Sequence, residues 1–175
     1  QEPAVLDIID IRLLEPRPKD HQQENWLLDP DTRWRKVATL PWDFLGEYVD
    51  EVTPLWSSNH STNNGINDAV PLLEARSQGH SLRLIKLDVL NIEVRLIGGG
   101  QFETKRRVYG TFKFAGALYS LSITDPIYRS YFLGKADGHY RLRNCFLTIS
   151  LGEEFMGSCY KLIAAVMQQD GRPTE

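Results

Sequence analysis

The clearest pattern along the chain is a regular alternation of apolar and polar positions in residues 106–114. From Val108 on, one set of alternate positions is apolar or glycine, and the other set is polar or aromatic. The polar set consists of Arg107, Tyr109, Thr111 and Lys113. Residues 117–124 return with the same period, and Ala115–Gly116 is a two-residue link suited to a tight turn. The pattern predicts a half-buried antiparallel hairpin.

Further strands are predicted on both sides of this hairpin. Residues 5–14, which alternate over their second half, indicate a half-buried strand, and residues 82–89 and 91–97 give strong strand signals, the latter with clear alternation. The nearly continuous apolar runs at residues 145–151 and 160–167 indicate strands in the centre of a sheet.

Helices are predicted to be few and short. One begins at Pro41 and covers residues 41–49, because proline tolerates the first helical position, and another covers residues 127–133. Residues 57–68 are rich in Ser, Asn and Thr and predict a loop. Many short strands with close turns and short helices favour a mainly β fold of the small-barrel class.

Three consecutive glycines after residue 97 suggest a division of the chain. We expect a first β subdomain at residues 1–97 and a second at residues 98–175, built from the hairpin and two core strands. The first carries 10 Lys and Arg against 16 Asp and Glu, and the second carries 10 against 7. The first is therefore acidic, with all 4 tryptophans, and the second is basic. A basic half can present a face to an anionic ligand, although ordinary variation in composition also explains the difference.

Composition sets the broad class of the protein. Hydrophobic residues make up 42% of the 175 residues, enough for an ordinary core. No apolar run approaches the ~18 residues that span a bilayer and no signal peptide is visible, so we expect no membrane segments. Only two cysteines are present, which makes a reducing, cytoplasmic setting the default expectation. Cys145 and Cys159 lie in apolar strands without zinc spacing. We expect both to be free and buried, although a bridge is possible if their strands pair.

Several short segments occur along the chain in a distinctive order. They are LDIIDIRLL (6–14), QENWLLD (23–29), LW (55–56), GIND (65–68), SLRLI (81–85), LSITDP (121–126) and SLGEEFMGSCYKLIAAV (150–166). This set resembles the dual OB domain (DuOB-like) proteins of prokaryotes, which are often linked to defence or conflict systems. The resemblance implies two small OB-like barrels packed together and a binding role as a sensor or adaptor, toward nucleic acid or a nucleotide.

The resemblance also has a gap. Members of that family open with a basic segment containing Ser-Arg-Lys and Gly-Arg-Cys before the first strand seen here. The sequence has nothing corresponding to it. We therefore expect the first barrel to lack its first strand, and no ligand contact of that segment is carried over to this chain.

Two basic clusters are candidates for binding single-stranded nucleic acid. OB barrels that bind it combine cationic side chains with aromatic rings that stack on bases. One cluster contains Lys105, Arg106, Arg107, Tyr109 and Lys113. The other contains Arg141 and Arg143, beside His139 and Tyr140. The alternative is a solvated strand face whose charges prevent edge-to-edge aggregation.

Lys161 is a further candidate because it lies between Tyr160 and an apolar run. A cation in such a place needs a partner, a path to water or a ligand. A lysine at a strand end that reaches solvent is the alternative interpretation.

No catalytic constellation is recognisable in the sequence. The 4 histidines are scattered, no metal-ligand spacing occurs, and no two carboxylates form an evident acid–base pair. We expect a non-enzymatic module without cofactor or metal, which binds single-stranded nucleic acid or a nucleotide. The alternative is a protein–protein interaction subunit that uses the acidic half with Trp26, Trp34, Trp42 and Trp56. A small hydrolase with an unrecognised site is a third interpretation.

Overall fold

The computed structural model describes residues 3–57, 59–99, 102–170 and 173. The prediction of a mainly β fold with short helices in the connections is confirmed. The helical elements are η1 (Trp42–Tyr48), α1 (Leu72–Arg76) and α2 (Pro126–Leu133). Within the described part of the chain, no helix has the length and apolar character needed to cross a membrane.

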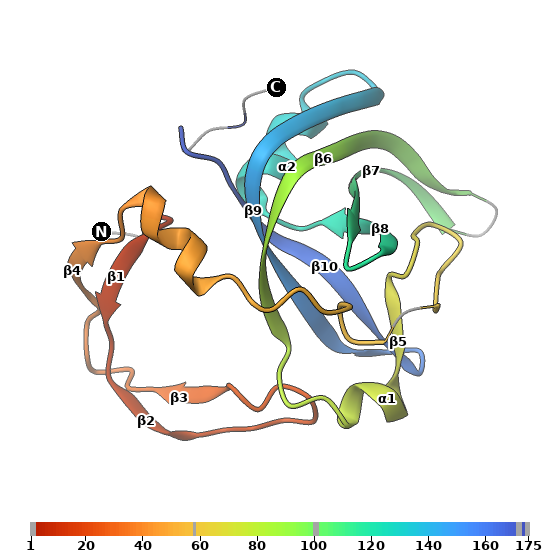
Figure 1. Ribbon diagram of the computed structural model, residues 1–175. Helices are drawn as coiled ribbons and strands as arrows, with labels where there is room; N and C mark the ends of the chain where they lie inside the picture. The colour runs from red at the N-terminus through yellow and green to blue at the C-terminus, as the bar shows by residue number, and fades with distance from the viewer. Residues whose placement is uncertain (1–2, 58, 100–101, 171–172, 174–175) are drawn as a thin grey trace.

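The C-terminal part of the chain folds into a closed ring of strands (Figure 1). These are β6 (Leu82–Gly99), β7 (Phe102–Phe114), β8 (Ala117–Ile123), β9 (Gly138–Phe155) and β10 (Ser158–Met167). The order around the ring is β6–β7–β8–β10–β9, and β9 pairs again with β6. The β8–β10 pairing is parallel and the others are antiparallel. With α2 between the third and fourth strands, this is the arrangement of an OB barrel.

Apolar side chains at alternate strand positions fill the inside of the barrel. Leu90, Leu121, Leu142 and Ile163 are fully buried in one continuous core. Phe132 of α2 belongs to the same core, so the helix covers part of it. Alternation in each strand therefore separates an inner apolar face from an outer polar face.

The strand β6 is continuous, whereas the alternation predicts two separate strands at residues 82–89 and 91–97. Leu87 and Leu90 are both buried, so the inward-facing positions shift by one residue between them. Opposite this point, Asn144 in β9 has a positive φ of 48°. The pairing of the two strands continues through the irregularity, from Leu82 to Val94 of β6.

The division expected after residue 97 falls near the end of β6. Strands β6 and β7 form one antiparallel hairpin that crosses this point, and both belong to the barrel. A division there would separate the first strand of the barrel from the other strands. We therefore propose Leu82 as the start of the second structural unit.

The N-terminal part forms a two-stranded ribbon in two sections. In the first section β1 (Asp7–Asp10) pairs with β4 (Arg35–Thr39), and in the second β2 (Leu13–Pro16) pairs with β3 (Trp26–Leu28). Every residue of β2, β3 and β4 is exposed. Figure 1 shows the ribbon beside the barrel, without closing into a ring of its own. The second OB-like unit is thus a complete barrel, and the first is represented by an open ribbon.

Residues 59–68, which we call the strap, lie against the edge of the barrel between β8 and β10. Ile66 and Ser120 exchange backbone hydrogen bonds of 3.1 and 2.9 Å. The following strand β5 (Ala69–Pro71) pairs antiparallel with the beginning of β10. Since β8 and β10 pair directly at only two positions, Ser122 and Ile123, the strap and β5 complete the hydrogen bonding beside that seam.

Candidate nucleic-acid interface

Four strands of the barrel carry a transverse row of polar side chains on their outer face. Residues opposite each other on paired strands point to the same side of a sheet. The row consists of Arg141, Asn91, Thr111 and Ser120, on β9, β6, β7 and β8 respectively. Arg141 Nε donates to Asn91 Oδ1 at 3.3 Å, and Thr111 Oγ1 donates to Ser120 Oγ at 3.0 Å. The row thus consists of two hydrogen-bonded pairs, of which Ser120 is buried beside the strap.

Four cations of the predicted site lie on this outer face. Lys113 lies two residues from Thr111 along β7, and Arg143 lies two residues from Arg141 along β9. Arg107 is on the same side of β7 but four residues from Thr111, beyond Tyr109. All four side chains are exposed. In the part of the chain that the structure describes, none of the four has an ion-pair partner. Their charge is therefore available to an anionic ligand.

The outer face contains two shallow hollows that meet at Asn91. The larger measures about 630 Å³ and is lined by His139, Tyr140, Arg141 and Arg143 as well as Asn91. The smaller measures about 370 Å³, and its polar lining includes Asp88, Thr111 and Lys113. Together they give the polar row a concave surface across β9, β6 and β7.

Arg106 does not share this face, because successive side chains of a strand point to opposite sides. Its guanidinium donates to Asp137 Oδ1 at 2.8 Å and to the carbonyl oxygens of Leu133 and Lys135 at 2.7 and 2.6 Å. These carbonyls belong to the end of α2 and the residues after it. The structure thus places Arg106 as a tether for α2, away from Arg107.

Lys161 lies inside the protein, with 1% of its surface exposed. Its Nζ donates to the carbonyl oxygens of Ser57 and Asn67 at 2.6 and 2.8 Å, and it lies 5.3 Å from the ring centre of Tyr119. Burial lowers the pKa of this amine to about 8. Lys161 therefore joins Ser57, which precedes the strap, to Asn67 near its end, and does not reach the outer face.

Tyr109 is on the outer face, but its ring is covered. Only 8% of the residue is exposed, and the Arg95 guanidinium lies 4.7 Å from the ring centre. Arg95 in turn donates to the carbonyl oxygen of Asn64 in the strap at 2.6 Å and pairs with Glu93 at 3.1 Å. Burial raises the pKa of the Tyr109 hydroxyl, and the nearby Asp68 carboxylate adds to this increase.

Lys105 points to the same side as Arg107 but lies further toward the end of the β6–β7 hairpin. It forms an ion pair of 2.8 Å with Glu103, and both side chains are largely exposed. The pair neutralises the charge at this end of the predicted cluster, so Lys105 adds little net positive charge.

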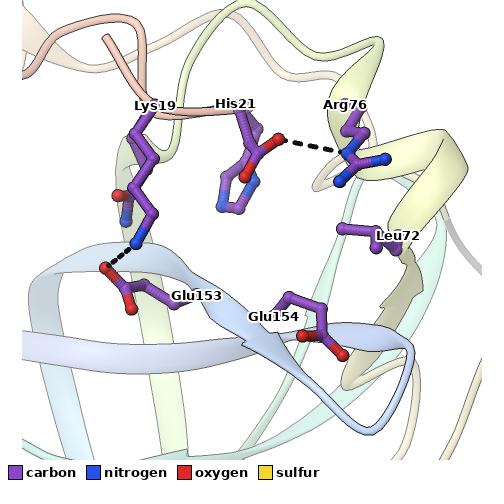
Figure 2. Close-up of a pocket in the computed structure, with 8 residues that line it drawn as sticks. Lys19, His21, Leu72, Arg76, Glu153 and Glu154 are labelled. Carbon is purple, nitrogen blue, oxygen red and sulfur yellow. Dashed lines mark hydrogen bonds and ion pairs between the residues drawn. The ribbon is translucent and has the colours of Figure 1, made fainter. Parts of the chain in front are cut away.

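A separate cavity, which we call the His21 cavity and which the sequence analysis did not anticipate, lies between the N-terminal segment and the barrel (Figure 2). It measures about 310 Å³ and is formed by residues 19–22, α1 and the β9–β10 hairpin. Lys19 pairs with Glu153 at 3.0 Å, and Arg76 pairs with Asp20 at 3.1 Å. Because both cations of the lining are paired, this cavity offers an anion less charge than the outer face.

His21 forms the buried wall of this cavity, with 2% exposure. Its sequence neighbourhood is polar and carries no pattern that predicts burial. Beneath it lies Cys159, whose Sγ is 3.9 Å from His21 Nδ1. Burial raises the pKa of the Cys159 thiol, so this cysteine stays protonated. Both cysteines are buried, as predicted, and neither forms a disulfide bridge.

The closed ring with its parallel β8–β10 seam and the helix between β8 and β9 defines an OB-fold protein. OB domains as a class bind nucleic acids, sugars or proteins, often through the second and third strands, which are β7 and β8 here. The chain belongs to the family of the dual OB-containing domain, whose model matches residues 1–166. Searches among the curated proteins and among the solved structures gave no match.

Proposed function

We propose that this protein binds nucleic acid on the outer face of its barrel, across β9, β6 and β7. The observation that carries the proposal is the group of exposed cations without ion-pair partners in the described part of the chain, Arg107, Lys113, Arg141 and Arg143. Lysine and arginine on a continuous surface attract phosphates and release their counterions. The amide of Asn91 adds a neutral donor between these charges.

We further propose that the protein acts in the cytoplasm as a sensor or adaptor module without catalytic activity of its own. The family resemblance supports this role, including its connection with prokaryotic defence. A short oligonucleotide and a free nucleotide share the phosphate chemistry that the cations favour. The spread of these cations over two strands that flank β6 supports the longer ligand.

The test is fluorescence anisotropy with a labelled single-stranded oligonucleotide at increasing salt. The variant Arg141→Glu/Arg143→Glu should bind at least about tenfold more weakly, with a salt slope lower by about two. Arg17→Glu/Arg33→Glu makes the same change in net charge on the N-terminal ribbon and serves as the control. Equal binding by both double variants would refute the proposed interface.

A second function is favoured by the N-terminal ribbon. Trp26 and Trp34 are 48% and 51% exposed, and Leu13 and Leu28, which face each other across the strands, are 42% and 40% exposed. Exposed aromatic groups beside apolar neighbours suit a protein partner. We therefore propose a protein-docking role for the ribbon, separate from the outer face.

The docking role predicts a partner that co-purifies with the wild type and is lost with Trp26→Ser/Trp34→Ser. Oligonucleotide binding by this variant should remain unchanged, because the ribbon is separate from the polar row. A partner that is retained by the variant would rule out the ribbon as the docking surface.

A further inference from the structure

Stacking on aromatic rings is the usual way in which OB barrels hold single-stranded bases. On this barrel Tyr109 has the central position for such contact, since it pairs with Glu93 on β6 and Ser122 on β8. The ring is buried and carries the Arg95 guanidinium on its face. A base has no access to that face while Arg95 remains there.

The strap fixes Arg95 in this position by contacts at several points. Asn64 accepts the hydrogen bond from Arg95, and Ile66 is held by its two backbone bonds with Ser120. Asn67 Nδ2 donates to the carbonyl oxygen of Leu118 at 2.9 Å, and the Asn67 carbonyl accepts from the buried Lys161. Release of the ring would require the loss of several of these bonds together.

The other ring beside the row, that of Tyr140, is also engaged within the protein. Its centre lies 5.5 Å from that of Phe132, and Lys135 Nζ lies 5.3 Å from it. Its hydroxyl donates to the carbonyl oxygen of Ala136 at 2.8 Å. The groups that this face offers a ligand include the guanidinium, ammonium and amide groups of Arg141, Lys113 and Asn91, which are donors to phosphate oxygens. The exposed imidazole of His139 also lines the larger hollow.

We propose that the outer face recognises the phosphate backbone of nucleic acid and that neither Tyr109 nor Tyr140 stacks on its bases. This inference rests on the proposed function and specifies its ligand class as a polyanionic phosphodiester chain, irrespective of base identity. The strap and Arg95 act as the specificity-determining elements, because they occupy the surface on which bases would stack.

The decisive probe is an oligonucleotide of abasic sugar–phosphate units, compared by anisotropy competition with an ordinary oligonucleotide of equal length. Equal charge and absent bases isolate the contribution of stacking. We expect affinities within about threefold and equal salt slopes, because phosphate contacts dominate both. A loss of tenfold or more with the abasic chain, while the ordinary chain binds, would overturn the inference alone. If neither chain binds, the proposed function fails as well.

A second measurement uses Tyr109→Leu, which removes the ring and retains an apolar side chain. We expect oligonucleotide affinity within twofold of the wild type in a variant whose thermal unfolding remains cooperative. A folded variant with tenfold weaker binding would contradict the inference. If the variant does not fold, the comparison with the abasic chain decides.

Discussion

His21 Nε2 donates a hydrogen bond to the carbonyl oxygen of Leu151 at 3.0 Å, in the buried wall of the His21 cavity. A carbonyl oxygen only accepts, so Nε2 carries the hydrogen in this pair. The other ring nitrogen, Nδ1, is then able to accept from the Cys159 thiol. The hydrogen bond from His21 to Leu151 attaches the N-terminal segment to β9 of the barrel, next to the ion pair of Lys19 with Glu153.

Replacement of the imidazole should therefore loosen the segment that precedes the barrel. We expect His21→Ala to lower the free energy of unfolding by about 1–3 kcal/mol, because the buried Leu151 carbonyl loses its donor. Urea denaturation measures the change. Lys19→Ala is the control, and its exposed ion pair should contribute at most about 1 kcal/mol. Equal losses in the two variants would show that the His21 hydrogen bond adds nothing beyond a surface contact.

The buried amine of Lys161 predicts a rise of stability with pH. Its pKa is lowered from 10.5 to about 8 in the folded chain. Between these values the unfolded chain binds more protons than the folded chain, so the free energy of unfolding increases with pH. Below pH 8 both states hold the proton and this contribution is constant. The slope approaches about 1.4 kcal/mol per pH unit in the middle of the window.

The pH effect is measured as a difference between the wild type and Lys161→Met in urea unfolding from pH 7 to 10. The raised pKa values of Tyr109 and Tyr128, which are not in contact with Lys161, affect both proteins alike and cancel. Above pH 8 the free energy of unfolding of the wild type should rise relative to that of Lys161→Met. A difference that is independent of pH would mean that the amine is not desolvated in the folded chain.

Gly110 marks a place where the barrel interior has no room for a methyl group. A Cβ there would lie 2.5 Å from Ile163 Cδ1 and 3.0 Å from Leu90 Cδ1. We expect Gly110→Ala to cost about 1–3 kcal/mol of stability through overpacking. Ile163→Val removes the nearer atom, so the double variant should be more stable than the two single losses predict.

A matched substitution at Gly152 tests whether space is the cause. A Cβ at Gly152 would meet its nearest atom, the Tyr160 carbonyl oxygen, at 3.4 Å, an ordinary contact. Gly152→Ala should therefore change the free energy of unfolding by no more than about 0.5 kcal/mol. Additive losses for Gly110→Ala and Ile163→Val would contradict the overpacking explanation.

Asp125 joins the start of α2 to β10 through a buried carboxylate. Oδ1 accepts from the backbone of Ile127 and Tyr128 at 2.8 and 2.9 Å, and Oδ2 accepts from that of Val166 at 2.9 Å. We expect Asp125→Ala to cost about 3 kcal/mol or more, since three backbone donors lose their partner. Thermal and urea unfolding measure the loss.

Asp125→Asn separates the helix cap from the contact with β10. The amide oxygen still serves the helix, but the amide nitrogen is a donor and cannot replace the acceptor opposite Val166. We expect a loss between that of Asp125→Ala and zero. Asp43→Ala, in the first turn of the exposed η1, is the control with a small expected change. If Asp125→Asn leaves the free energy of unfolding unchanged, the whole loss in Asp125→Ala comes from the helix cap.

Local alternation was enough to predict the β7–β8 hairpin. Burial agrees with the predicted faces except at Tyr109 and Ser120, which are on the outer face but buried, and Ala115 and Gly116 form the turn at φ values of 48° and 79°. The parallel pairing of β8 with β10 could not be predicted in this way. It joins Ile123 to Ile163, and the pairing of distant strands in the chain leaves no local pattern in either segment.

Only part of the candidate site could be predicted from the sequence, because local alternation gives the face of each side chain but not its distant contacts. Alternation already places Arg106 on the side of the apolar Val108 and opposite Arg107, and it places Lys161 with Cys159. That signal was sufficient to separate Arg106 and Lys161 from the outer face. The cover over Tyr109 had no such signal, because it depends on contacts of Arg95 with a strap about 30 residues away in the chain.

The position of β10 in the barrel determines when the fold can close. This strand pairs with β5, β8 and β9, and all three precede it in the chain. During synthesis their edges stay unpaired until residues 158–167 have left the ribosome. The hairpins before them can form locally, but the barrel core becomes sealed only when β10 arrives. Unpaired strand edges invite association with other chains in that interval. The nascent chain is therefore most in need of protection shortly before β10 is complete.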